Sequence, residues 1–265
     1  MVTLGDLVKP YEEMSDEAKA VFMLAIKLAD KDQDRLLKKV KGGKMKYYIL
    51  ANGEGTRWNN YKGVPKQLIE IDGETILHRM VRLLNEEGVP KEDIFICGPF
   101  EDEGAQSIMT KSPTKREVFE EIADLAQGPF TILYGDCYYT KACMHAIVTR
   151  PIHKFDEFMN ATGNPNTGCP WCEGYAHRCE AWKWWKDQMH ELNTNTDKIS
   201  LYKDWYIHFW LLGYKEGLSM NRFPNINDYT DFDVQWCDQT DDFDYPSDLD
   251  KFCEVTGHKC TNKEA

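Results

Sequence analysis

The sequence predicts an α/β fold in which a mostly parallel, doubly wound sheet carries helices on both faces. Short apolar runs typical of buried strands alternate with stretches of helical periodicity between residues 45 and 140. Glycine, asparagine or aspartate follows several of these runs, at the strand ends where such sheets bind ligands. With 265 residues, of which 42% are hydrophobic, the chain is long enough for one large domain plus an appendage.

Residues 1–44 predict a helical extension that precedes a main domain over residues 45–265. Ser15 suits an N-cap because acidic residues follow it, and apolar residues then recur at helical spacing. Gly42-Gly43 should end this helix. Lysines gather near that end and form either a solvated helix end or a contact with a polyanion: Lys38, Lys39, Lys41, Lys44 and Lys46.

In the first half of the main domain, apolar residues from Ile76 to Leu84 predict a helix, and residues 114–127 predict a second one. Asp72-Gly73 predicts a turn before the first helix. The inward positions of the second helix should be Val118, Ile122 and either Leu125 or Ala126. Apolar runs predict strands over residues 47–50, 67–71, 94–97 and 130–134.

Residues 141–223 predict a variable region that binds the acceptor substrate. Residues 160–168 are rich in Asn, Gly, Thr and Pro, which predicts a loop able to cover a site. Aromatic residues also concentrate in this region and form either a core or an interface, or some of them stack on a sugar or base. The tryptophans concerned are Trp171, Trp182, Trp184, Trp185, Trp205 and Trp210.

The formal net charge is -12, from 44 acidic and 32 basic residues. This charge disfavours broad adhesion to nucleic acid or to an anionic membrane. No apolar run is long enough for a membrane span, and the first residues show no secretory signal. We therefore expect a cytoplasmic protein whose nine cysteines are thiols. The N-terminal helix or the aromatic region offers a surface for a homo-oligomer.

The stretch from residue 47 to residue 68 has the composition of a phosphate site. A predicted buried strand leads into two glycines, Gly53 and Gly55, which allow backbone N–H groups to approach phosphate oxygens. Arg57 adds a planar fork of donors, and Lys66 adds a compact charge nine positions later. The stretch therefore predicts binding of a triphosphate.

Residues 228–250 hold nine aspartates and neither lysine nor arginine. Five aromatic residues interrupt this segment, which is not typical of a purely solvating tail. A folded acidic edge that faces a cation is the better interpretation. Mg²⁺ prefers carboxylate oxygens, and one or two aspartates beside substrate phosphates suffice to hold it.

Four motifs occur in the order found in the MobA-like superfamily of sugar-1-phosphate nucleotidyltransferases, and the chain resembles that superfamily over about residues 45–252. They are Gly53-Glu54-Gly55-Thr56-Arg57, Pro65-Lys66, Gly135-Asp136 and Asp242-Phe243-Asp244-Tyr245-Pro246-Ser247-Asp248-Leu249. The resemblance implies a Rossmann-like, three-layer, GT-A-like fold. It also implies condensation of a nucleoside triphosphate with a sugar 1-phosphate, which gives a nucleotide sugar and pyrophosphate.

The resemblance assigns roles to individual residues. Arg57 and Lys66 would be catalytic, and Asp136 and Asp244 would hold the metal, Mg²⁺. Asn52 replaces the usual small residue, and Tyr245 and Ser247 replace the commoner Thr and Glu of the last motif. The expected nucleotide-binding residues are Leu50, Ala51, Asn52, Gly53, Glu54, Gly55 and Thr56.

Cys169 and Cys172, followed by His177 and Cys179, offer four zinc-ligand types close together. Only one residue separates His177 from Cys179, unlike the usual spacing of a zinc knuckle. Similar proteins have this segment without the cysteines, which favours a strand around Glu173 that lines the acceptor site. Cys253, His258 and Cys260 could add ligands only if the C-terminal segment folds back.

Other interpretations remain open at this point. Arg57 and Lys66 could be ordinary surface charges, and Asp136 and Asp244 could each cap the helix that follows. A glycosyltransferase can share the fold, although Asp136 is not part of an Asp-x-Asp motif here. A module that binds nucleotide without catalysis is the third interpretation, with partners joined through residues 1–44.

Overall fold

The computed structural model describes residues 44–53, 55–111, 115–151, 154–160, 163–170, 173–194 and 233–261. Residues 1–43, Glu54, Cys172 and the tryptophans at positions 171, 205 and 210 lie outside this part. The helical extension, the boundary of the acceptor region and the homo-oligomer therefore stay predictions. None of the described helices is long and apolar enough to cross a membrane.

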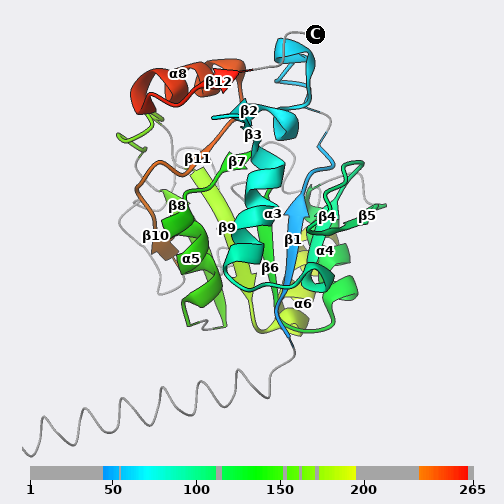
Figure 1. The fold of residues 1–265 in the computed structure, drawn as a ribbon. Coiled ribbons are helices and arrows are strands. Elements are labelled where there is room, and N and C mark those ends of the chain that lie inside the picture. The colour runs from blue at the N-terminus through cyan, green and yellow to red at the C-terminus, as the bar shows by residue number, and fades with distance from the viewer. Residues whose placement is uncertain are drawn as a thin grey trace, which may run out of the picture. The chain divides into compact units, whose positions relative to one another are not determined.

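A seven-stranded sheet forms the centre of the fold (Figure 1). Every pair of neighbouring strands in it is parallel except those made by β9, which runs antiparallel to both β6 and β8. The predicted mostly parallel sheet is thus confirmed. In spatial order the strands are β10 (Asp233–Gln235), β8 (Phe155–Asn160), β9 (Glu173–Cys179), β6 (Phe130–Tyr134), β1 (Lys46–Leu50), β4 (Ile94–Cys97) and β5 (Gln106–Ile108).

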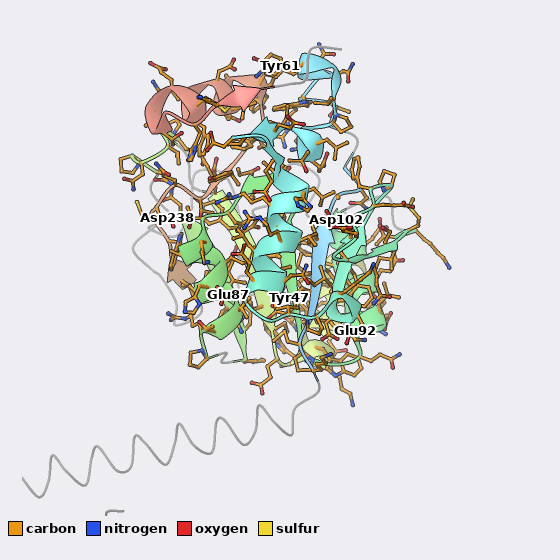
Figure 2. The ribbon with its side chains drawn as sticks, in the orientation of Figure 1. Tyr47, Tyr61, Glu87, Glu92, Asp102 and Asp238 are labelled. Carbon is orange, nitrogen blue, oxygen red and sulfur yellow. A yellow bond between two sulfur atoms is a disulfide. The ribbon has the colours of Figure 1, made fainter. Side chains whose placement is uncertain are left out.

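Helices cover both faces of this sheet, which confirms the predicted three layers. Because side chains alternate along a strand, β1 directs Tyr47 and Ile49 to one face and Tyr48 to the other. The first face packs against α3 (Ile76–Glu86) and α5 (Lys141–Thr149). The second packs against α4 (Lys115–Ala126) and α6 (Trp182–Thr194). Figure 2 shows the side chains that fill these layers and labels Tyr47.

The buried faces of the helices follow the predicted periodicity. On α4, Ala126 is the inward residue of the predicted pair, whereas Leu125 is 48% exposed. On α6, Trp185 is fully buried and its indole nitrogen donates to the carbonyl of Phe119 at 3.2 Å. This tryptophan belongs to the core, while Trp182 and Trp184 are partly buried against it.

A smaller layer lies beyond the carboxyl end of β1, where Figure 1 shows α8 (Pro246–Thr256) beside β12 (Cys260–Thr261) and β2 (Glu70–Ile71). The strand predicted over residues 67–71 is shorter than expected, since only Glu70 and Ile71 form a strand. Residues Lys66–Leu68 form a 3-10 turn, η2, because the amide of Ile69 donates to the carbonyl of Lys66. The remaining elements are β3 (Glu74–Thr75), β7 (Cys137–Tyr138), β11 (Asp241–Asp242), η1 (Tyr61–Gly63) and η3 (Lys91–Asp93).

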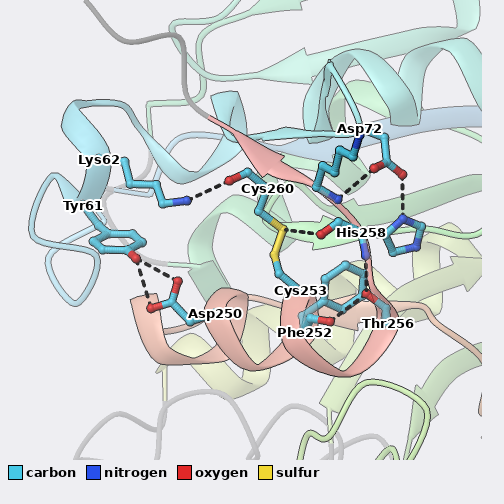
Figure 3. Close-up of a disulfide and its surroundings, with 10 residues drawn as sticks. Tyr61, Lys62, Asp72, Asp250, Phe252, Cys253, Thr256, His258 and Cys260 are labelled. Carbon is cyan, nitrogen blue, oxygen red and sulfur yellow. Dashed lines mark hydrogen bonds and ion pairs between the residues drawn. A yellow bond between two sulfur atoms is a disulfide. The ribbon is translucent and has the colours of Figure 1, made fainter.

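The C-terminal segment does fold back, and a disulfide between Cys253 and Cys260 joins it to α8 (Figure 3). The expectation that all nine cysteines are thiols is therefore wrong. The His258 ring contacts Asp72 at 2.6 Å and stacks on Phe252, and among the described residues it belongs to no group of metal-ligating side chains. Disulfides persist mainly in oxidising compartments, so the cytoplasmic location stays a prediction.

The segment predicted as a covering loop is packed into the fold. Asn164 and Thr167 are both buried, and the side-chain amide of Asn164 donates to the backbone carbonyls of Asp238 and Thr240 at 2.7 and 3.0 Å. The described part of the acidic stretch, residues 233–250, is folded as well, with Phe243 fully buried. These two segments therefore hold each other in place beside β8 and β9.

Candidate active site

The predicted site residues converge where β1 and β6 end. The amide of Gly135 donates to the carbonyl of Leu50 at 2.9 Å, so the two strand ends lie in direct contact. A Cβ on residue 135 would lie 2.2 Å from the same carbonyl oxygen, so any other residue would force the backbone to shift. Glycine allows this close approach, and it brings Asp136 to the edge of the sheet beside the loop that follows β1.

A compact turn presents Arg57. The amide of Trp58 donates to the carbonyl of Gly55 at 2.9 Å, and Gly55 has a φ of 60°, a backbone conformation that favours glycine. The Trp58 side chain is only 2% exposed and donates to the carbonyl of Val64 at 3.1 Å. Burial of this tryptophan anchors the turn, which leaves the Arg57 side chain 50% exposed at its rim.

Arg57 and Asp244 form a bidentate pair, with both guanidinium–carboxylate distances at 2.7 Å. The guanidinium carbon also lies 5.2 Å from the centre of the Tyr245 ring. Such a planar, two-point contact fixes the direction of the guanidinium. The same fork is suited to bind a phosphate in place of the carboxylate.

Lys66 is the buried cation of the site. Its ammonium contacts Asp136, lies 3.9 Å from Asp244 Oδ1 and donates to the carbonyl of Phe243 at 3.4 Å. Burial alone would lower the pKa of Lys66, but Asp136, Asp242 and Asp244 outweigh it and raise the pKa. The lysine is therefore charged and points toward three carboxylates.

Neither aspartate is the cap of the helix that follows it. Thr140 accepts from the amide of Cys143 at 3.0 Å and so begins α5, and Asp248 accepts from the amide of Tyr245 at 2.6 Å at the start of α8. The capping interpretations of Asp136 and Asp244 are thus wrong. Both carboxylates instead lie within the set of charges around Lys66.

Asp242, which opens the last motif but was assigned no role from the sequence, is a further member of this site. Its carboxylate lies within 4.8 Å of that of Asp136 and of the thiol of Cys137. Burial raises the pKa of the Cys137 thiol well above its usual value, so the thiol keeps its proton. The two carboxylates are therefore the ligands available to a metal ion. Carboxylate oxygens at this separation fit Mg²⁺. The antiparallel pairing of β11 with β7, which places Asp242 opposite Cys137, involves too few residues to be read from periodicity.

The residues expected to bind the nucleotide lie next to these charges. Ala51 is buried, while Asn52 and Gly53 are exposed, and the Asn52 amide donates to Thr110 Oγ1 at 2.8 Å. Nothing lies within 4 Å of a Cβ built on Gly53. Leu50 ends β1, Thr56 is exposed beside Arg57, and Glu54 lies outside the described residues.

Three of the residues considered for zinc are described by the structure, and Cys169, His177 and Cys179 do not meet. His177 lies in the core, where its Nε2 contacts the Tyr134 hydroxyl at 2.5 Å and its ring stacks on Phe155. Cys179 is buried at the far end of β9, whereas Cys169 contacts Glu173 at the strand's start. In the described part of the chain, Cys169, His177 and Cys179 therefore form no shared metal site.

No family model and no curated protein sequence matches the chain, but solved structures do. A protein assigned as a glucose-1-phosphate thymidylyltransferase from Bacillus anthracis has a TM-score of 0.54 at 13% identity, over 83% of this chain and 98% of that one. CTP:phosphocholine cytidylyltransferase from Streptococcus pneumoniae has 0.52 at 13%, over 80% and 99%. Inositol-1-phosphate CTP transferase from T. maritima has 0.50 at 14%, over 82% and 96%. The chain therefore has the Rossmann-like fold of these nucleotidyltransferases.

Proposed function

We propose that the protein is a nucleotidyltransferase that condenses a nucleoside triphosphate with a sugar 1-phosphate to a nucleotide sugar and pyrophosphate. One observation carries the proposal: Arg57 and Lys66 meet Asp136 and Asp244 at the carboxyl edge of a nucleotidyltransferase-like sheet. That edge is where doubly wound folds bind ligands. The fold, shared with enzymes whose names specify nucleotidyl transfer, supports the same reaction class.

The chemistry of this reaction matches the charges of the site. Attack of a phosphate oxygen on the α-phosphorus brings anions together and builds negative charge on the departing pyrophosphate. Catalysis then depends on positioning and electrostatic stabilisation, and no covalent nucleophile is required. Arg57 would bind the triphosphate with its fork, and Lys66 would stabilise the α-phosphate oxygens. Residues 50–56 would bind the rest of the nucleotide.

Asp136 and Asp244 would hold Mg²⁺, with Asp242 as a third carboxylate beside them. The ion would neutralise the triphosphate and help to align it. The convergence of three carboxylates on Lys66 supports this assignment, because the structure already places one cation among them.

We propose the cytoplasm as the location and a homo-oligomer as the assembly, and neither affects the assignment of the site.

A single plate assay tests the proposed reaction. The protein is incubated with Mg²⁺, each nucleoside triphosphate and a panel of sugar 1-phosphates, and released pyrophosphate is measured. Pyrophosphate that depends on both substrates and on the metal is the expected result. Parallel wells receive nucleotide sugars instead of these substrates, and release of a nucleoside diphosphate there would indicate a glycosyltransferase. Tight nucleotide binding without turnover across the panel would indicate a binding module.

Lys66→Ala should lower turnover about 100-fold or more, the scale of losing one preorganised charge at the transition state. Lys186→Ala is the matched control, since Lys186 lies on α6 and pairs with Asp124. Pyrophosphate release and circular dichroism are measured for both variants. If folded Lys66→Ala released pyrophosphate at the parental rate, the role assigned to this lysine would be wrong.

A further inference from the structure

A second group of metal-ligating side chains lies outside the proposed reaction site. It consists of Cys169, Glu173 and Asp241, whose donor atoms all lie within 4.8 Å of one another. The three residues come from a turn, from the start of β9 and from β11, so only the fold brings them together. The Cys169 thiol donates to Glu173 Oε1 at 2.9 Å. This group contains a soft ligand, unlike the carboxylates around Lys66.

Asp241 shows that the group lacks a positive partner. The residue is only 2% exposed, and its Oδ1 has no hydrogen-bond partner within the described part of the chain, while the carboxyl group as a whole hydrogen-bonds to Glu173 and Thr167. A buried carboxylate oxygen without a partner is costly, and it must gain either a proton or a cation. The group thus lies in an environment that disfavours negative charge unless a cation is bound.

The backbone holds the thiol in position. The backbone amide of Asn164 donates to the backbone carbonyl of Cys169 at 2.7 Å, and Asn164 is itself fully buried. Gly163 lies so close that a Cβ on it would be 2.9 Å from the same carbonyl oxygen. The Asn164 side chain also donates to the carbonyl of Thr240 at 3.0 Å, directly before β11, so Cys169 is fixed relative to β11 by packed residues. Donors held in this way need little reorganisation to bind an ion.

We propose that Cys169, Glu173 and Asp241 bind a divalent transition metal, Zn²⁺ in preference to Mg²⁺, at a site separate from Asp136. A thiolate selects zinc or a similar ion, whereas Mg²⁺ takes oxygen ligands. Three protein ligands leave the fourth tetrahedral position for water. This inference does not rest on the proposed function.

The position of β11 gives such a metal a structural consequence. Successive side chains of a strand point to opposite sides, so Asp241 contributes to this group while Asp242 lies beside Asp136. A metal on Asp241 would fix β11 and with it the segment that leads to Asp244. The two candidate ion sites are therefore neighbours with different ligand chemistry.

The test uses the full chain, stripped with a chelator and then loaded with Zn²⁺ or Co²⁺. The metal content is measured by mass spectrometry after desalting, and Co²⁺ bound to a thiolate gives a near-ultraviolet charge-transfer band. We expect one Zn²⁺ per chain and that band in the parental protein. Cys169→Ser should abolish the band, and Asp241→Asn should weaken Zn²⁺ binding by at least the roughly 10- to 100-fold that loss of an outer-shell partner causes.

Two matched controls distinguish this site from other thiols and from the reaction site. Cys237→Ser removes an exposed thiol that contacts the Asn166 amide at 3.5 Å, and it should keep both the zinc and the band. Asp136→Asn should keep them as well. Absence of the cobalt band in the parental protein would overturn the proposal without any variant. Loss of zinc in Asp136→Asn, or an unchanged band in Cys169→Ser, would also overturn it.

Discussion

At the scale of single residues, each cation of the site contacts a carboxylate in the structure. Arg57 binds Asp244 with both arms, and Lys66 lies between Asp136 and Asp244. These pairs keep buried or half-buried charges neutralised and directed toward one point. A triphosphate that enters must therefore compete with Asp244 for Arg57, and a divalent ion must compete with Lys66 for the carboxylates.

Arg57→Lys tests whether the shape of the guanidinium matters as well as its charge. Lysine keeps the positive charge but loses the two-point contact that Arg57 makes with Asp244. We expect kcat/KM for the triphosphate to fall about 10-fold or more, on the scale of one charge-assisted hydrogen bond. Steady-state pyrophosphate assays measure the change. A kcat/KM equal to that of the parental enzyme would show that only the charge is needed.

The order of the motifs allowed Arg57, Lys66, Asp136 and Asp244 to be predicted, and the structure brings all four together. Trp58 was not predicted as part of the site, and Asp242 opens the last motif but was given no role. Trp58 acts through burial beneath the turn, which an isolated tryptophan in a sequence does not reveal. Strand pairing is what places the carboxylate of Asp242 beside that of Asp136.

At the scale of elements, the long strands and helices were predicted well because their periodicity extends over many residues. β4 and β6 match the predicted residues 94–97 and 130–134, and α3 begins at the predicted Ile76. The strands β2, β7, β11 and β12 have two residues each, too few for a periodic signal. The pairings of β7 with β11 and of β2 with β12 join residues far apart in the sequence, so tertiary contacts define them.

The contact between the ends of β1 and β6 predicts a large effect for Gly135→Ala. The added methyl group would lie 2.2 Å from the carbonyl oxygen of Leu50, which forces the backbone to shift. We expect the free energy of unfolding to fall by about 3 kcal/mol, at the upper end of the usual cost of overpacking. Gly53→Ala is the control, since its Cβ would meet nothing within 4 Å. Urea denaturation curves compare the two, and equal midpoints would contradict the prediction.

The disulfide between Cys253 and Cys260 should stabilise the layer that holds α8 against β2. β12 pairs with β2, and Lys62 donates to the carbonyl of Cys260 at 3.1 Å, so the cross-link joins several contacts (Figure 3). Replacing both cysteines with serine should lower the free energy of unfolding by about 2 kcal/mol, as expected for a short closed loop. Reductant should have the same effect on the parental protein and none on the double variant, as measured by thermal unfolding.

At the scale of the molecule, the alternation of strands and helices was enough to predict the fold class.

The chain has a net charge of -12, so the protonation of its carboxylates affects how the stability of the fold depends on pH. Glu74 accepts from Arg82 Nε and Nη2 at 2.6 and 2.8 Å. These hydrogen bonds outweigh burial and lower the pKa of Glu74 below its ordinary value of 4.5. A carboxyl group whose pKa is lowered in the native state stabilises the fold at pH values above its ordinary pKa. This stabilisation is lost as the pH falls through the native pKa.

Acid unfolding of Glu74→Gln tests this sign. On acidification from about pH 6 to about pH 3, the parental protein should lose about 1 kcal/mol more stability than the variant, the scale of a partly exposed ion pair. Glu101→Gln, which changes an exposed carboxylate, is the control and should follow the parental curve. Identical curves for the parental protein and Glu74→Gln would refute the assignment.

The late position of Asp242 and Asp244 also affects when the site forms during synthesis. Arg57 and Lys66 are made early, but their carboxylate partner Asp244 lies 187 residues after Arg57. Ribosomes add about 5–20 residues per second, so the two cations wait for roughly ten seconds or more before that partner emerges. A nascent chain truncated before β11 would expose a cationic turn without its partner.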